Sequence, residues 1–123
     1  CSPMPGDYTV VMFDSYGDGW QTTSGGDGGQ GLEIDMDGVV TSVAMCSQWG
    51  TFDFECTPTS DGYNAVATVT IPAGTQSATW TWPGDYYGEI GLEILAPDGS
   101  VAFSALDPGT VPVGLLPVAV CAE

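Results

Sequence analysis

The residues of this chain that could do chemistry are concentrated in one short stretch, MFDSYGDGWQ, residues 12–21. Asp14 and Asp18 stand there among glycines and aromatic residues, directly after a hydrophobic run. Carboxylates spaced in this way suit a hard cation, which binds through oxygen atoms. The same letters also fit an Asp-Gly turn whose aspartates cap backbone N–H groups, a common feature of β proteins.

The spacing of the two aspartates resembles the start of a calcium loop. Asp14, Asp18 and Gly19 would occupy positions 1, 5 and 6 of an EF-hand loop, and Trp20 would offer its backbone carbonyl at position 7. The match stops there, because a tyrosine and a glycine stand at positions 3 and 12 and no flanking helices are expected. The pattern indicates calcium-loop chemistry without the EF-hand fold.

Two carboxylates do not satisfy a cation that takes six to eight oxygen ligands. The glycine-rich continuation at 22–31, TTSGGDGGQG, can fold back toward the ion because glycine accepts unusual backbone angles. It would bring Asp27 and several backbone carbonyls. We therefore expect a calcium site formed by Asp14 and Asp18, completed by Asp27 and the Trp20 carbonyl.

The charge balance favours the cation over the bare turn. The 123 residues include 16 Asp and Glu but no Lys, Arg or His, which gives a formal net charge of −16. No side-chain salt bridge is possible, so metal cations, backbone N–H groups or low pH must relieve the repulsion. Binding to nucleic acid is not expected, because that binding depends on Lys and Arg. Membrane insertion is not expected either, since the longest apolar run, at 111–120, is short and interrupted by prolines.

Four cysteines indicate disulfides and therefore an oxidising, extracellular compartment, secreted or at a cell surface. Three pairings are possible. Cys1 and Cys121 stand at the two ends, where a bridge would join the termini, and Cys46 and Cys56 flank a short loop. This arrangement favours Cys1 with Cys121 and Cys46 with Cys56. Because the chain begins with Cys1, we take it to be a processed product or a segment of a longer polypeptide.

The elements that must position these residues are all β-strands. Alternating apolar and polar residues, as in GLEIDMDG at 31–38, predict half-buried strands, and Asp-Gly pairs predict turns between them. The expected class is all-β, a single domain over 1–123 with eight or nine short strands in a two-sheet, jelly-roll-like β-sandwich. Prolines in the final strand place it at a sheet edge or in a bulge. The predicted strands are 8–14, 31–38, 39–45, 51–55, 65–71, 77–82, 88–95, 100–106 and 111–120.

The stretch YTVVMFDSYGDGWQ, residues 8–21, resembles the DSYGDGW-type calcium-binding β-sandwich modules of secreted and surface proteins. The later tract PGDYYGEIGLEILAPDGSVAF is similar to the part of such modules where an acidic residue precedes an alternating strand. The resemblance covers about half of the chain and implies a calcium-stabilised extracellular sandwich. On it, Asp14 and Asp18 carry over by position, and Glu89 is implied as a further ligand. Gln21 and Thr22 stand where many members have Asn-Gly.

We do not expect an enzyme. Without His, Lys or Arg, catalytic triads, Schiff bases and cationic oxyanion clamps are all excluded. A pair of carboxylates could still hydrolyse glycosides. The candidates are Glu33, Glu55, Glu89 and Glu93, of which Glu33 and Glu93 lie on strands whose acidic residues are expected to face solvent.

Two functions without catalysis remain. The first is a structural subunit that self-assembles into an extracellular filament, sheath or surface matrix through strand edges and cation bridging. The second is a carbohydrate-binding or adhesion module of a larger secreted protein, with aromatic rings stacking on sugar rings of a polysaccharide. Alternation predicts that Trp80 and Trp82 belong to the core, so Tyr86, Tyr87 and Trp49 are the expected contacts with sugar or with another subunit.

Overall fold

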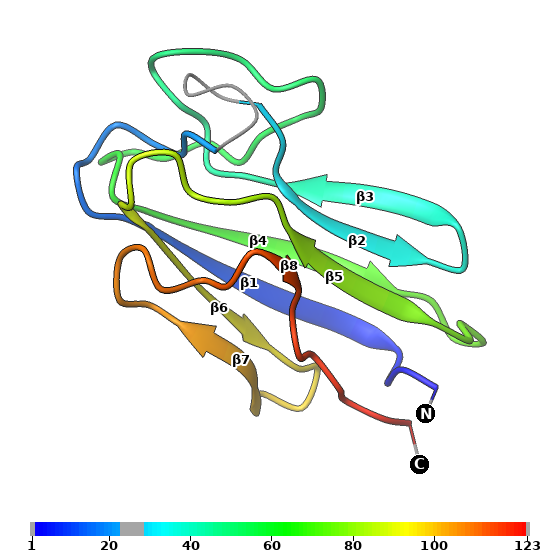
Figure 1. Ribbon diagram of the computed structural model, residues 1–123. Helices are drawn as coiled ribbons and strands as arrows, with labels where there is room; N and C mark the ends of the chain where they lie inside the picture. Colours follow the sequence, from blue (N-terminus) through cyan, green and yellow to red (C-terminus); the bar gives the residue numbers. More distant parts are fainter. Residues whose placement is uncertain (1, 23–28, 123) are drawn as a thin grey trace.

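The computed structural model describes residues 2–22 and 29–122, which form a β-sandwich of two antiparallel four-stranded sheets (Figure 1). The strand order is β4-β1-β6-β7 in one sheet and β3-β2-β5-β8 in the other. This confirms the predicted all-β, two-sheet class. The strands are β1 (Gly6–Asp14), β2 (Leu32–Met36), β3 (Val39–Val43), β4 (Asn64–Ile71), β5 (Ala78–Trp82), β6 (Ile90–Leu95), β7 (Val101–Ala105) and β8 (Gly114–Leu115).

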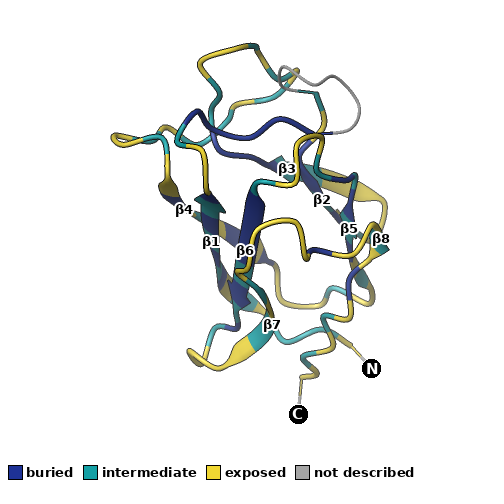
Figure 2. Ribbon diagram, turned by 60° about the vertical axis from the view of Figure 1, so that its left-hand side comes forward, coloured by how far each residue is buried: buried dark blue, intermediate teal, exposed yellow. Residues whose placement is uncertain are grey.

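The core lies between the two sheets because alternate residues of each strand face inward (Figure 2). Tyr8, Val10 and Met12 supply the inner face of β1, and Trp80 and Trp82 supply that of β5. Both tryptophans are buried, as the alternation in SATWTW predicts. The other large, fully buried side chains are Trp20, Leu32, Ile34, Met45, Ile71, Ile90, Leu92 and Ile94.

Two predicted strands differ from the structure. Residues 51–55 form no strand, and Phe52 makes only an isolated bridge with Gly29. The final strand is reduced to Gly114–Leu115, because the prolines on either side of it lack the N–H that a ladder needs. β8 does lie at a sheet edge, as those prolines predict.

Turns and covalent links fix the connections. Asp37 and Gly38, both with positive φ, form the predicted two-residue turn between β2 and β3. Cys46 and Cys56 form a disulfide, and Cys121 is also disulfide-bonded. The predicted partner of Cys121, Cys1, lies outside the described residues. The described residues include no helix that is long and apolar enough to cross a membrane.

Candidate metal centre

The pairing of β1 with β6 places two acidic residues at one end of the first sheet. Asp14 is the last residue of β1 and stands opposite Ile90, the first residue of β6. Because the two strands are antiparallel, Glu89, which immediately precedes β6, lies at the same end. The backbone N–H of Ser15 donates to the carbonyl of Glu89 at 2.8 Å and holds the two segments together.

Asp14 also brings Asp18 to this end of the sheet. Its Oδ2 accepts hydrogen bonds from the backbone N–H groups of Gly17 at 2.7 Å and Asp18 at 2.9 Å. The loop that leaves β1 is thereby folded back over the strand end. The Asp-Gly turn considered from the sequence is therefore present, but it occupies only one oxygen of Asp14.

Glycines at 17 and 19 allow this tight loop. Both have positive φ, 88° and 84°, a conformation that other residues seldom adopt. A Cβ at position 19 would also meet the carbonyl of Cys46, and one at position 17 would meet the ring of Tyr63. The two glycines of DSYGDGW thus let the loop pack against the segments around Cys46 and Tyr63.

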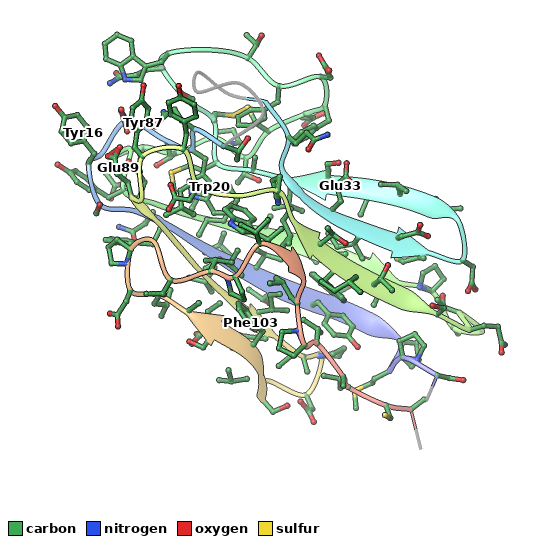
Figure 3. The ribbon with its side chains drawn as sticks, viewed as in Figure 1. Tyr16, Trp20, Glu33, Tyr87, Glu89 and Phe103 are labelled. Atoms are coloured by element: carbon green, nitrogen blue, oxygen red, sulfur yellow. A yellow bond between two sulfur atoms is a disulfide. The ribbon has the colours of Figure 1, made fainter. Side chains whose placement is uncertain are left out.

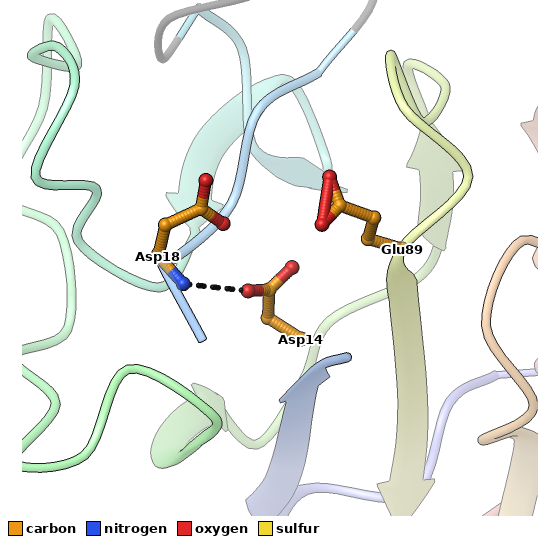
Figure 4. A group of neighbouring side chains, drawn as sticks. All are labelled: Asp14, Asp18 and Glu89. Atoms are coloured by element: carbon orange, nitrogen blue, oxygen red, sulfur yellow. Dashed lines mark hydrogen bonds between the residues drawn. The ribbon is translucent and has the colours of Figure 1, made fainter. Parts of the chain in front are cut away.

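The three carboxylates converge on one point (Figure 4). One oxygen each of Asp14, Asp18 and Glu89 lie within 4.8 Å of one another. Asp14 is 0 % exposed and Asp18 is 9 % exposed. Within the described structure, Oδ1 of Asp14, Oδ1 of Asp18 and Oε2 of Glu89 are buried and accept no hydrogen bond. Buried oxygens are rarely left without a partner, so a ligand that supplies positive charge fits this point.

The pKa values of the cluster also favour a positively charged ligand at this point. The pKa of Asp14 is raised to about 7, mainly by burial and also by the neighbouring Asp18 carboxylate, and the backbone N–H groups of Asp18 and Gly17 lower it only in part. Burial also raises the pKa of Glu89, with added contributions from the charges of Asp18 and Asp85. Without a cation, Asp14 and Glu89 therefore resist ionisation.

The disulfide loop supplies contacts that sequence reasoning did not predict. The indole N–H of Trp49 donates to Oδ2 of Asp18 at 2.9 Å, across 31 positions of the chain. The side-chain amide of Gln21 donates to the carbonyl of Asp18 at 3.2 Å and to Oγ of Ser47 at 2.8 Å. The Trp49 contact fixes the Asp18 carboxylate, and the Gln21 contacts hold its backbone against Ser47. No periodicity in the sequence signals a contact between loops so far apart.

The segment that carries Glu89 is shaped by Asp85. Its two carboxylate oxygens accept hydrogen bonds from the backbone N–H groups of Gly88, Glu89 and Ile90 at 2.8 to 3.1 Å. Asp85 therefore closes a turn that directs the chain from Tyr87 into β6. The letters GDYYGE contain the Asp and Gly of such a turn, which is the signal that could have identified it.

The structure places the other predicted site residues as follows. The Trp20 ring is buried and its indole N–H donates to the carbonyl of Phe13 at 3.1 Å, while a ligand role for the Trp20 carbonyl stays a prediction. Asp27 lies outside the described residues. Trp49, Tyr86 and Tyr87 are 62 %, 54 % and 60 % exposed.

Exposed aromatic side chains gather at the end of the molecule that holds the cluster. Figure 3 shows Tyr16 and Tyr87 beside Glu89. The rings of Tyr86 and Tyr87 contact each other edge to face, with centroids 4.8 Å apart. The loops that hold the carboxylates thus also carry exposed aromatic rings.

Fold and site together define the class: an acidic, disulfide-bonded β-sandwich with a cluster of two buried aspartates and a half-buried glutamate that could hold a metal ion. Comparison of the chain with protein-family models, curated proteins and solved structures found no match.

Proposed function

We propose that the chain is a calcium-stabilised extracellular subunit that assembles into a filament, sheath or surface matrix. The observation that carries the calcium part is the set of three buried carboxylate oxygens without hydrogen-bond partners. In a chain with no Lys, Arg or His, no side chain could neutralise them.

Calcium suits the spacing as well as the charge. Its oxygen ligands lie at about 2.3 to 2.6 Å, so two ligands on opposite sides of one ion are at most about 5 Å apart. One oxygen each of Asp14, Asp18 and Glu89 lie within 4.8 Å of one another, so the three residues fit around a single ion. Backbone carbonyls, water and Asp27 would supply the remaining ligands, and an all-oxygen set favours calcium over softer metals.

The extracellular and structural parts rest on the covalent and chemical character of the chain. Its disulfides are typical of oxidising compartments. It offers no Lys or Arg to proteases of trypsin specificity. Small residues, short strands and a crosslinked loop are properties that suit a durable building block.

Thermal unfolding tests the calcium part. We expect the melting temperature of the purified chain to rise when calcium is added and to fall when a chelator removes it. With an extracellular-type Kd of about 10⁻⁴ to 10⁻³ M, a tenfold excess of calcium over Kd would add about 1.4 kcal/mol. Identical melting curves with calcium and with chelator would contradict the calcium site and would mean that Asp14 and Asp18 only form an Asp-Gly turn.

Electron microscopy of the native material tests the structural part. Regular polymers that dissociate or soften in chelator are expected. Dispersed monomers at all calcium concentrations would contradict a structural subunit.

A second candidate, a carbohydrate-binding or adhesion module, is favoured by the exposed aromatic rings. Trp49 is held beside Asp18 by its indole N–H, and aromatic faces of this kind stack on sugar rings. In this case the chain would bind a polysaccharide column in calcium, and Trp49→Ala would elute earlier while Val113→Ala, at another exposed site, would not. No retention of the unmodified chain on any polysaccharide tested would leave assembly as the better proposal.

A further inference from the structure

The acidic residues of the strands are distributed unusually between inner and edge strands. In the described structure, the four edge strands β3, β4, β7 and β8 contain no Asp or Glu. Of the four inner strands, β1, β2 and β6 contain them and β5 does not. Soluble proteins more often place charge on edge strands, because an uncharged edge pairs with other chains.

Among these edges, β4 offers the longest regular ladder. It spans eight residues without proline and pairs with β1 in continuous register from Asn64 to Ile71. By contrast, β3 and β7 have five residues each, the pairing of β7 includes a register shift, and β8 has two residues. Among described residues, no backbone hydrogen bond joins 65–71 to a segment other than β1. Alternate residues of β4 therefore present free N–H and C=O groups at the edge.

The side chains beside this edge are neutral. Val66, 60 % exposed, stands opposite Val11 of β1, and Thr68 stands opposite Thr9. Carboxylates lie toward the two ends of the strand, where Asp61 accepts from the N–H of Asn64 and Asp7 accepts from the hydroxyl of Thr70. Glu93 lies two strands from the edge, on the far side of Val11. The central residues 65–69 form an uncharged, β-favouring strip at one side of the first sheet.

The charge of the chain indicates what this strip would pair with. Two copies, each with a formal charge of −16, repel one another, and the repulsion is weakest where the surfaces that meet carry no carboxylate. A cationic partner would instead be drawn to the acidic loops. An eight-residue edge is matched in length by the same edge of another copy, and a two-fold, self-complementary contact is the commonest kind between identical chains.

From these observations we propose that β4 pairs with β4 of a second copy of this chain, which joins two four-stranded sheets into one of eight strands. The inference rests on the proposed assembling function and deepens it, because it names one contact of the assembly; this two-fold contact joins copies in pairs, and a polymer needs a further contact between the pairs. Bound calcium lowers the net charge of each copy and thereby favours the pairing.

A pair of glutamate variants tests the contact. Val66→Glu puts a carboxylate into the strip, and the two-fold arrangement brings two such charges together. Val113→Glu makes the same change at another exposed valine, 73 % exposed, outside β4. Sedimentation in calcium is expected to show at least a tenfold weaker association for Val66→Glu and unchanged association for Val113→Glu. Equal association of Val66→Glu and the unmodified chain would overturn the inference, as would equal loss in both variants.

Hydrogen exchange of the unmodified chain gives a test that does not depend on folding of a variant. Alternate amides of 65–71 are expected to become protected as concentration rises, while amides of β3 stay constant. Assemblies in which β4 amides exchange as fast as in dilute solution would overturn the β4 contact and leave the proposed assembly standing. A chain that stays monomeric at all calcium concentrations would overturn both.

Discussion

Two opposing influences act on the ionisation of the Asp14 carboxyl group, and their balance decides whether it is charged in the absence of a cation. One of its oxygens accepts two backbone N–H groups, which favours the ionised form. The other is buried beside Asp18 and Glu89 with no hydrogen-bond donor among the described residues, which disfavours it. Without a cation the second influence prevails and raises the pKa to about 7. A bound cation would reverse this balance.

Replacing Asp14 by Asn separates the two influences. The Asn oxygen keeps the acceptor for Gly17 and Asp18, and the charge disappears. We expect Asp14→Asn to melt at a higher temperature than the unmodified chain in chelator, because repulsion is removed, and to show no further rise with calcium. Differential scanning calorimetry with and without calcium measures both effects.

The matched control is Asp107→Asn, which removes the same charge from an exposed position outside the cluster. It should retain the full calcium response. A calcium response in Asp14→Asn equal to that of the control would contradict a role for Asp14 in ion binding.

The three candidate ligands differ in how far the sequence alone predicts them. Asp14 and Asp18 follow from spacing, because four positions in a glycine-containing loop bring both carboxylates to one strand end. Glu89 was implied only through the resemblance, since its proximity depends on the pairing of β1 with β6. The hydrogen bond from Trp49 was not predictable, because a disulfide loop distant in the sequence provides it.

At the scale of elements, the loop after β1 depends on close packing against the segment at Cys46. A Cβ at position 19 would meet the Cys46 carbonyl, whereas a Cβ at Gly74 would meet nothing within 4 Å, although both glycines have similar positive φ, 84° and 88°. The two positions therefore separate backbone strain from steric overlap.

We expect Gly74→Ala to cost about 1 to 2 kcal/mol, the usual cost of a left-handed backbone for an L-residue. Gly19→Ala should cost about 1 to 3 kcal/mol more, because the added methyl group must displace its neighbours. It should also weaken calcium binding, since Asp18 precedes it. Urea unfolding in calcium and in chelator measures these differences. Equal destabilisation by the two variants would show that the close approach at Cys46 has no energetic weight.

The Cys46–Cys56 disulfide closes the loop that carries Trp49. For a loop of this length the chain-entropy model gives about 2 to 3 kcal/mol. We expect the double variant Cys46→Ser with Cys56→Ser to lose that much stability and to bind calcium more weakly, because Trp49 no longer holds Asp18. Denaturant unfolding and calcium titration check the two effects. Using the variant instead of a reductant leaves the disulfide of Cys121 intact, and unchanged calcium affinity would mean that Asp18 is held without this loop.

Most elements were predictable because period-2 alternation marks a strand with one buried face. The failure at 51–55 is informative, since the alternation there is real: Phe52 and Phe54 do contact each other, with ring centroids 5.1 Å apart. The segment lies inside the disulfide loop, where it meets one residue of another segment and no strand. Alternation predicts which side chains lie on the same side of a segment. A strand also needs a neighbouring strand to form hydrogen bonds with, and the alternation does not show whether one is present.

For the whole molecule, the net charge of −16 and the crowding of carboxylates in the cluster both oppose further negative charge in the calcium-free chain. Asp14 and Glu89 have pKa values raised by burial, so in the folded, calcium-free chain they favour the protonated form. Their contribution to stability is then complete below the pKa of the unfolded chain and is lost as pH rises through the higher folded value.

We therefore expect the calcium-free chain to become less stable as pH rises from the ordinary Asp14 pKa of 3.8 to the raised value of about 7, and the slope due to Asp14 to flatten above that value. Saturating calcium should reduce this slope. Melting temperatures across that range, with Asp14→Asn as the comparison, measure it, and the variant should show a shallower slope in chelator. A calcium-free melting temperature that is constant or rises with pH would contradict the expectation.

Ser2 and Ala122, the described residues nearest the two ends of the chain, are joined by a backbone hydrogen bond at the end of the sandwich away from the carboxylate cluster (Figure 1, Figure 3). Pro3 bridges to Cys121 there, and β1 extends from this end for roughly 27 Å before it reaches Asp14. A chain immobilised on a sensor surface through either terminus would therefore keep its ion-binding loops directed toward the solution. The same tether would leave the long side of the first sheet unobstructed, so ion uptake and pairing between copies could be followed on one immobilised sample.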